Sequence, residues 1–164
     1  MKKFSIFIVT SILFWSCSTK QYLISTNQQD LTQIQKISVV KNDISFVIPV
    51  GIYPNYKNID DFVIKKVPAI SDIETLICSE LKKRNINCEI VNETLSNNDE
   101  TYYIKYQDYW AWDFKKYMHV LKISILKNGS VVRSVVSQGN TAGMHDYPNP
   151  EKQVPLLIEL ILKR

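Results

Sequence analysis

A run of mostly aromatic residues at every second position is the best candidate for binding chemistry in this sequence of 164 residues. Side chains of one parity lie on one face of a strand, and this set comprises Tyr102, Ile104, Tyr106, Trp110, Trp112 and Phe114. Aromatic rings bury about 150–250 Å² each beneath a covering helix and are strand formers, so we favour a role in the core. The alternative is a platform for a sugar or a peptide, with Asp108 and Asp113 as hydrogen-bond acceptors. On the opposite face, Tyr103 and Tyr109 could still serve as surface contacts.

Two histidines offer little material for catalysis. His119 shares the parity of Leu121 and Ile123, which indicates a partly buried structural residue. His145 stands beside Asp146 in a predicted loop, but a single His-Asp pair arises easily by chance. The sequence has no Gly-x-Ser-x-Gly, His-Glu-x-x-His or phosphate-binding loop. We therefore predict no catalytic residue, no metal site and no cofactor, and an envelope hydrolase centred on His145 and Asp146 is the weakest functional hypothesis.

Cys78 and Cys88 are the two cysteines outside the N-terminal segment. They fall on a predicted helix and on the strand that follows it, so a disulfide would close a short loop. The alternative is a pair of small buried thiols. The sequence does not fix the distance between the two sulfur atoms, and both arrangements remain open.

The N-terminal residues have the features of an export signal. Lys2 and Lys3 precede a mostly apolar run from Phe4 to Trp15, which is shorter than the roughly 20 residues of a membrane-spanning helix. The following Ser16-Cys17, with Leu13 upstream, resembles the lipobox of bacterial lipoproteins. That resemblance implies cleavage before Cys17 and attachment of diacylglycerol to its sulfur, which would anchor the protein to a membrane.

The same resemblance predicts a location and a division of the chain. In lipoproteins, an Asp directly after the lipidated Cys often marks retention in the inner membrane. This chain has Ser18 at that position and so resembles lipoproteins sorted to the outer membrane. We expect the protein to face the periplasm. We expect a signal peptide at residues 1–16, a lipidated Cys17 with a flexible Ser/Thr/Gln-rich tether to residue 35, and a single domain at residues 36–164.

The composition is that of a folded domain, with 45% hydrophobic and 22% charged residues. The formal net charge is +4, and removal of Lys2 and Lys3 with the signal peptide would halve it. This excess is too small to indicate a nucleic-acid surface.

Turn and cap signals predict the elements that would position these residues. Ser71 and Glu74 form a capping box that begins a helix ending at Asn85. Short strands are expected at residues 37–40, 44–50 and 86–90, an irregular excursion at 51–68, and a final helix from Pro150 or, better, Pro155 to Lys163.

An antiparallel meander is expected over residues 101–138. A change of parity requires a turn or bulge near residues 113–116. Asn128-Gly129 is a strong hairpin signal, which would place Ile125, Ile123 and Leu121 opposite Val132, Ser134 and Val136.

These elements predict an α+β two-layer sandwich, with a mostly antiparallel sheet of four to five strands and two helices packed on one face. The segment from Tyr106 to Asp113 resembles a Tyr-x-Asp-x-Trp-x-Trp-Asp strand of small bacterial lipoproteins, a resemblance that implies a similar α+β sandwich and no particular activity. The leading hypothesis is a non-enzymatic lipoprotein that binds another envelope protein or stabilises an envelope complex, with its membrane contact made by the lipid. The alternative is a glycan- or peptidoglycan-binding module that uses the aromatic strand.

Overall fold

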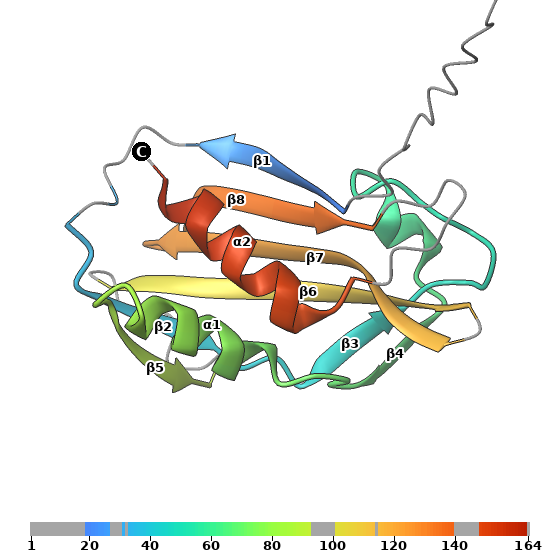
Figure 1. Ribbon diagram of the computed structural model, residues 1–164, viewed down its shortest axis with the longest axis horizontal. Helices are drawn as coiled ribbons and strands as arrows, with labels where there is room; N and C mark the ends of the chain where they lie inside the picture. Colours follow the sequence, from blue (N-terminus) through green and yellow to red (C-terminus); the bar gives the residue numbers. More distant parts are fainter. Residues whose placement is uncertain are drawn as a thin grey trace, which may run out of the picture.

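One mixed sheet of eight strands forms the frame of the protein (Figure 1). The structure, a computed structural model, describes residues 19–26, 31, 33–92, 101–113, 115–139 and 148–163. The strands are β1 (Lys20–Thr26), β2 (Lys36–Val40), β3 (Ile44–Val47), β4 (Lys65–Pro68), β5 (Asn87–Val91), β6 (Tyr102–Asp113), β7 (Lys115–Lys127) and β8 (Ser130–Gln138). The helices are α1 (Ile73–Lys82), α2 (Pro150–Leu162) and the short 3₁₀ helix η1 (Ile59–Phe62).

The strand order is β1-β8-β7-β6-β2-β5. Antiparallel pairs join β1, β8, β7 and β6, whereas β2 runs parallel to both β5 and β6. Further along β6, β3 takes the place of β2 as its parallel neighbour and pairs antiparallel with β4. The long strand β6 is therefore flanked on one side by β7 and on the other by two short strands in succession.

The predicted sheet was wrong. It has eight strands rather than four to five, and the sheet is mixed, because β2 pairs parallel with β5 and β6, and β3 pairs parallel with β6. The two-layer description also fails, because residues 48–63 pack against side chains on the face of the sheet opposite to α1 and α2. Parallel pairing joins residues far apart in the chain, so neither periodicity nor turn chemistry indicates it.

The segment expected to be a flexible tether contributes to the fold. Its residues 20–26 form β1, which pairs with β8 from Lys20 opposite Gln138 to Thr26 opposite Arg133. Leu31 and Ile34 are buried in the core. The folded domain therefore begins before residue 36, because backbone hydrogen bonds to β8 hold an edge strand whose polar composition suggested a coil.

The two helices begin and end at residues with suitable caps. Asp72, one residue after the predicted Ser71, accepts a hydrogen bond from the Thr75 amide at 3.2 Å. Asn85 follows α1 with φ 61°, in agreement with the predicted end of the helix. The helix α2 begins at Pro150 behind the Asn149 cap, and Pro155 lies inside it rather than at its start.

Two β-bulges, in β8 and β7, set which side chains of the long hairpin face which side of the sheet. The Asn128-Gly129 turn has positive φ at both residues, as the hairpin requires. A bulge between Ile125 and Leu126 then places Ile123 opposite Val135 rather than Ser134, so the predicted register is wrong beyond that point. A second bulge, in β7, lies opposite Tyr109.

Hydrophobic clusters lie on both faces of the sheet. The first core lies beneath α1 and α2 and includes Ile37, Val39, Ile73, Ile77, Leu81, Ile104, Trp110, Leu121, Ile123, Leu157 and Ile161. The second core lies beneath residues 48–63 and consists of Ile48, Ile59, Tyr109, Ala111, Tyr117, Val120 and Val136, with Tyr22, Phe46, Tyr53, Tyr56 and Val63 packed against it.

Candidate functional site

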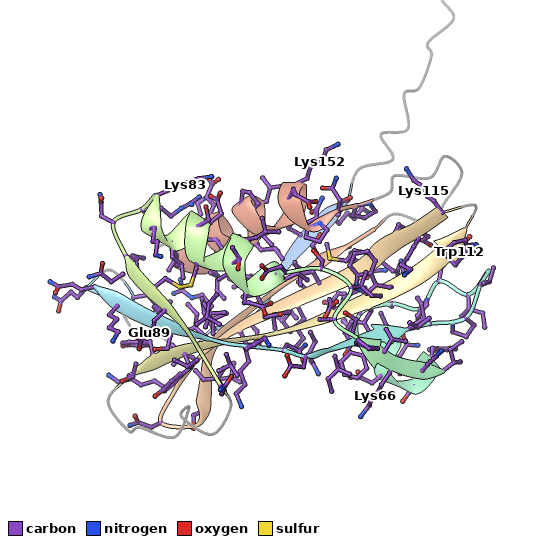
Figure 2. All side chains as sticks on the ribbon, turned by 90° about the horizontal axis from the view of Figure 1, so that it is seen from below. Lys66, Lys83, Glu89, Trp112, Lys115 and Lys152 are labelled. Carbon is purple, nitrogen blue, oxygen red and sulfur yellow. A yellow bond between two sulfur atoms is a disulfide. The ribbon has the colours of Figure 1, made fainter. Side chains whose placement is uncertain are left out.

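A largely apolar groove of about 380 Å³ lies between the end of β4 and the tip of the β6–β7 hairpin. Its lining comprises Val47, Val67, Pro68, Ala69, Ile70, Trp110, Ala111, Trp112 and Lys116. Two of the predicted aromatic residues therefore share a concave surface, which we call the tryptophan groove. Trp110 is buried, whereas Trp112 is 52% exposed at the end of the molecule (Figure 2).

A buried carboxylate positions Trp110 in this groove. Asp108 Oδ2 accepts hydrogen bonds from the Trp110 indole Nε1 at 2.6 Å and from the Ser45 hydroxyl at 2.5 Å. The Ser45 oxygen in turn accepts the Ile70 amide at 3.0 Å. This network joins β6, β3 and the segment before α1. Burial raises the pKa of Asp108, and the two donated hydrogen bonds oppose that rise by stabilising the carboxylate.

A second buried carboxylate belongs to α1. Glu74 accepts a hydrogen bond from the Tyr106 hydroxyl. Burial raises the pKa of Tyr106, and the Glu74 carboxylate adds to the effect because it is the acceptor for the phenol proton. The sequence had assigned Glu74 to a capping box, and only the packing of α1 on β6 shows its contact with Tyr106.

His119 belongs to the opposite face from the one predicted. The bulge in β7 leaves Val120 opposite Tyr109 and Met118 opposite Trp110, so His119 is the extra residue between them. Its ring lies 6.3 Å from those of Tyr53 and Tyr117, and its Nε2 is 3.0 Å from the Pro54 carbonyl oxygen. Nδ1 is buried without a hydrogen-bond partner among the described atoms. Burial lowers the pKa of His119, which favours the neutral ring with its proton on Nε2.

The other candidate binding residues do not join this groove as described surface contacts. Tyr103 and Tyr109 are buried rather than exposed, and the Tyr109 hydroxyl donates to Asp60 at 2.5 Å. The backbone of Asp113 ends β6, but its side chain lies outside the described residues. Cys17, His145 and Asp146 also lie outside them. The structure thus brings together Asp108, Trp110 and Trp112, and not the full predicted set.

A disulfide joins the other two candidate residues. Cys78 on α1 and Cys88 on β5 are bonded, with their Cα atoms 5.3 Å apart. Beside the disulfide is an open groove of about 790 Å³, which is lined by Thr75, Cys78, Ser79, Lys82, Lys83, Cys88, Glu89 and Ile90. We call it the disulfide groove. The sequence had identified the cysteines but not the groove, which exists because β5 is an edge strand.

Charged side chains border the disulfide groove as ion pairs. Glu80 contacts Lys83 and Arg84, and these two hydrogen-bonded cations lower the pKa of Glu80. Across the sheet edge, Glu89 contacts Lys36 at 2.9 Å and accepts the Ser38 hydroxyl, and both contacts lower the pKa of Glu89. The Lys36–Glu89 pair is exposed on both sides and contributes little stability. Glu80 is buried beneath its two cationic partners.

Neither a metal centre nor a spanning helix is found in the described part of the chain. Within these ranges, no group of three or more His, Cys, Asp or Glu side chains is arranged to hold a metal ion. The described helices are also too short or too polar to cross a bilayer.

Comparison with known proteins gives a structural likeness and no family. No protein-family model matches the chain, and no curated protein sequence does so either. Two solved structures of PelC dodecamers from Paraburkholderia phytofirmans are similar, with TM-scores of 0.46 and 0.47 at 15% and 14% sequence identity. Each comparison covers 88% of this chain and 96% of the PelC chain. A likeness of this extent is a similarity alone and supports no statement about what this chain binds or how it assembles.

Proposed function

We propose that this protein is a non-enzymatic lipoprotein of the bacterial cell envelope, held at the outer membrane through Cys17 and facing the periplasm. Its folded domain binds another envelope protein. The resemblance of residues 4–17 to a lipoprotein signal supports the anchor.

The buried titratable side chains hydrogen-bond to other parts of the fold, and this observation supports the proposal that the protein is not an enzyme. Asp108 is held by Ser45 and Trp110, Glu74 accepts the Tyr106 hydroxyl, and His119 donates to a backbone carbonyl. A general acid or base must come within hydrogen-bond reach of a substrate. These groups instead hold elements of the structure together, which supports a binding role.

The disulfide groove is the surface we assign to the partner protein. Among the described strands, β5 pairs with β2 and with no other, so its outer edge offers backbone hydrogen-bonding groups. The adjacent groove offers the apolar surface of the disulfide and Ile90 between charged residues. An edge strand beside a side-chain pocket suits an extended segment that adds to the sheet.

Membrane fractionation tests the anchor. We expect wild-type protein to stay with membranes after a carbonate wash and the Cys17→Ala variant to be released, because only the wild type carries the acyl chains. Retention of the variant in washed membranes would contradict lipid anchoring.

Site-specific cross-linking in cells tests the partner surface. A photoreactive residue at position 90 should give a discrete protein adduct, because Ile90 lines the disulfide groove. Position 156 on α2 is the matched control, since Leu156 is 46% exposed and Ile90 is 44% exposed. Equal yields at the two positions, or no adduct at position 90, would contradict this assignment.

Glycan binding remains the second candidate because Trp112 is exposed beside Lys116 in the tryptophan groove. Sedimentation with insoluble peptidoglycan distinguishes it. Binding by wild type that is lost in Trp112→Ala and kept in Val131→Ala would favour the glycan, whereas no sedimentation of wild type would exclude it.

A further inference from the structure

The sheet register places the membrane anchor at one defined end of the domain. Lys20 lies opposite Gln138, Gln138 opposite Val120, and Val120 opposite Tyr109. Tyr109 is in turn level with Phe46 of β3. The chain before Lys20 therefore leaves the sheet on the side toward which β6 and β3 run. We call this the anchor end; its described residues are 48–64, 110–113, 115–118 and 148–152.

The chain between the anchor and the fold is short. Only three residue steps separate Cys17 from Lys20, and an extended chain covers about 10 Å over that length. A tether reaching residue 35 would have let the domain drift from the bilayer, but β1 removes that freedom by pairing with β8. With lipid on Cys17, the anchor end must therefore stay close to the membrane surface.

The most exposed large apolar side chains of the described residues gather at this end. Val50 is 68% exposed, Ile64 65% and Trp112 52%, and every other described large hydrophobic residue is less than half exposed. Val50 lies near the start of the segment that covers the second core, and Ile64 directly follows that segment, where its amide donates to the carbonyl oxygen of Val47, the last residue of β3. Trp112 projects from the hairpin tip at the same end (Figure 2).

Lysines surround these apolar residues. Exposed lysines at or next to the anchor end are Lys57, Lys65, Lys66, Lys115, Lys116 and Lys152. Within the anchor end, the four lysines Lys57, Lys115, Lys116 and Lys152 face as many acidic residues, which are Asp60, Asp61, Asp113 and Glu151. Lys65 and Lys66, which directly follow Ile64, supply the excess of positive charge. In Figure 2, Lys66, Lys115 and Trp112 lie toward one end of the molecule, and Lys83 and Glu89 lie toward the other. Exposed apolar side chains rimmed by cations suit the interface of an anionic bilayer.

We propose that the anchor end docks on the membrane that holds the lipid, with Trp112, Val50 and Ile64 in the headgroup region and the lysines among anionic headgroups. The inference rests on the lipid anchor of the proposed function and assigns an orientation to it. The disulfide groove, on the opposite edge strand, is then left accessible to the periplasm. Trp112 cannot at the same time serve as a glycan platform, so this proposal and the glycan alternative exclude each other.

Quenching by brominated lipid tests the docking. The mature lipidated protein is placed in vesicles of phosphatidylglycerol with brominated phosphatidylcholine, and its tryptophan emission is compared with that in unbrominated vesicles. Trp15 is removed with the signal peptide, so Trp110 and Trp112 report. We expect wild-type emission to fall and the fall to be largely lost in Trp112→Phe, because the remaining Trp110 is buried.

A second variant moves the exposed reporter away from the membrane. In Trp112→Phe combined with Val131→Trp, the new indole replaces a side chain that is 43% exposed near the Asn128-Gly129 turn, at the opposite end of the sheet. We expect no added quenching from it. Carbonate-resistant protein whose wild-type Trp112 is unquenched, or whose new indole at position 131 is quenched as strongly, would overturn the docking and leave the anchor intact. Wild-type protein that is released by carbonate would overturn both proposals.

Discussion

The two faces of the sheet are covered by different kinds of chain and hold different kinds of side chains. The first core, beneath α1 and α2, is mainly aliphatic. The second core, beneath residues 48–63, is rich in aromatic residues, with Tyr109 and Tyr117 inside it and Tyr22, Phe46, Tyr53 and Tyr56 around it. A ring contact between Phe46 and Tyr109, with centroids 5.1 Å apart, is typical of this side.

The difference in side-chain type follows from the backbone hydrogen bonding of the segment that packs on each face. A helix satisfies its own backbone groups, so aliphatic side chains suffice beneath it. An irregular segment leaves backbone groups unpaired, and these need partners. Here His119 donates to the Pro54 carbonyl and the Gln138 side chain accepts the Tyr56 amide, while Tyr109 reaches Asp60. Large residues with polar tips therefore fill the space and hold the irregular cover at once.

The largest expected effect on stability comes from truncating one buried isoleucine in each core and comparing the two losses. Ile77→Ala in the first core should lower the free energy of unfolding by about 2–5 kcal/mol, because a cavity remains between regular elements. Ile59→Ala in the second core should lower it less, because η1 and its loops can move to close the gap. Urea unfolding measures both, and a larger loss for Ile59→Ala would contradict the contrast.

The second largest expected loss of stability comes from removing the Asp108 carboxylate, which holds Trp110 of the first core. Asp108→Ala leaves the Ser45 hydroxyl and the Trp110 indole without their acceptor, and we expect a loss of about 2–4 kcal/mol. Asp108→Asn keeps an acceptor oxygen and is the matched control, with a smaller loss expected. Thermal unfolding of the two variants provides the comparison. Equal losses would show that the charge of Asp108, and not its acceptor geometry, is what matters.

The disulfide is expected to contribute about 2–3 kcal/mol, because it closes a short loop in the unfolded chain. Replacement of both Cys78 and Cys88 by Ala should therefore lower the unfolding free energy by that amount. Hydrogen exchange should show the added opening in α1 and β5, with β7 and the second core protected as before. Faster exchange throughout the sheet would instead indicate that the two faces unfold together.

The smallest expected effect is a loss of stability at acidic pH that comes from His119, which packs beside the second core. Burial lowers the pKa of His119 below its ordinary value of 6.5, so the unfolded chain binds the proton more readily than the folded one. Stability from this group is complete above pH 6.5 and is lost as the pH falls from there toward the lowered pKa. His119→Gln retains a donor for Pro54 and should flatten this part of the stability profile. Wild type and variant with the same slope below pH 6.5 would contradict the effect.

The candidate site was only partly predictable. The alternation of aromatic residues correctly marked Tyr106 and Trp110 as core residues, and it placed Trp112 on the same strand face. It did not show that Trp112 would be exposed, because β6 extends beyond the elements that cover Trp110. It also did not show that Tyr109 would be buried, because its cover comes from residues 48–63, which have no regular pattern. Tyr103 is buried as well, against the same expectation.

By itself, the sequence determined the features whose causes lie within a few residues of one another. Asn128, Gly129 and Asn85 adopt the positive φ that asparagine tolerates and that glycine adopts freely, and the apolar face of α1 follows its helical spacing. Only the tertiary structure decided the parallel pairing of β2, the incorporation of β1 and the side on which His119 lies. Strand partners are selected by hydrogen bonds and burial between distant segments, and one bulge reverses the facing of every residue beyond it, so these features depend on the whole fold.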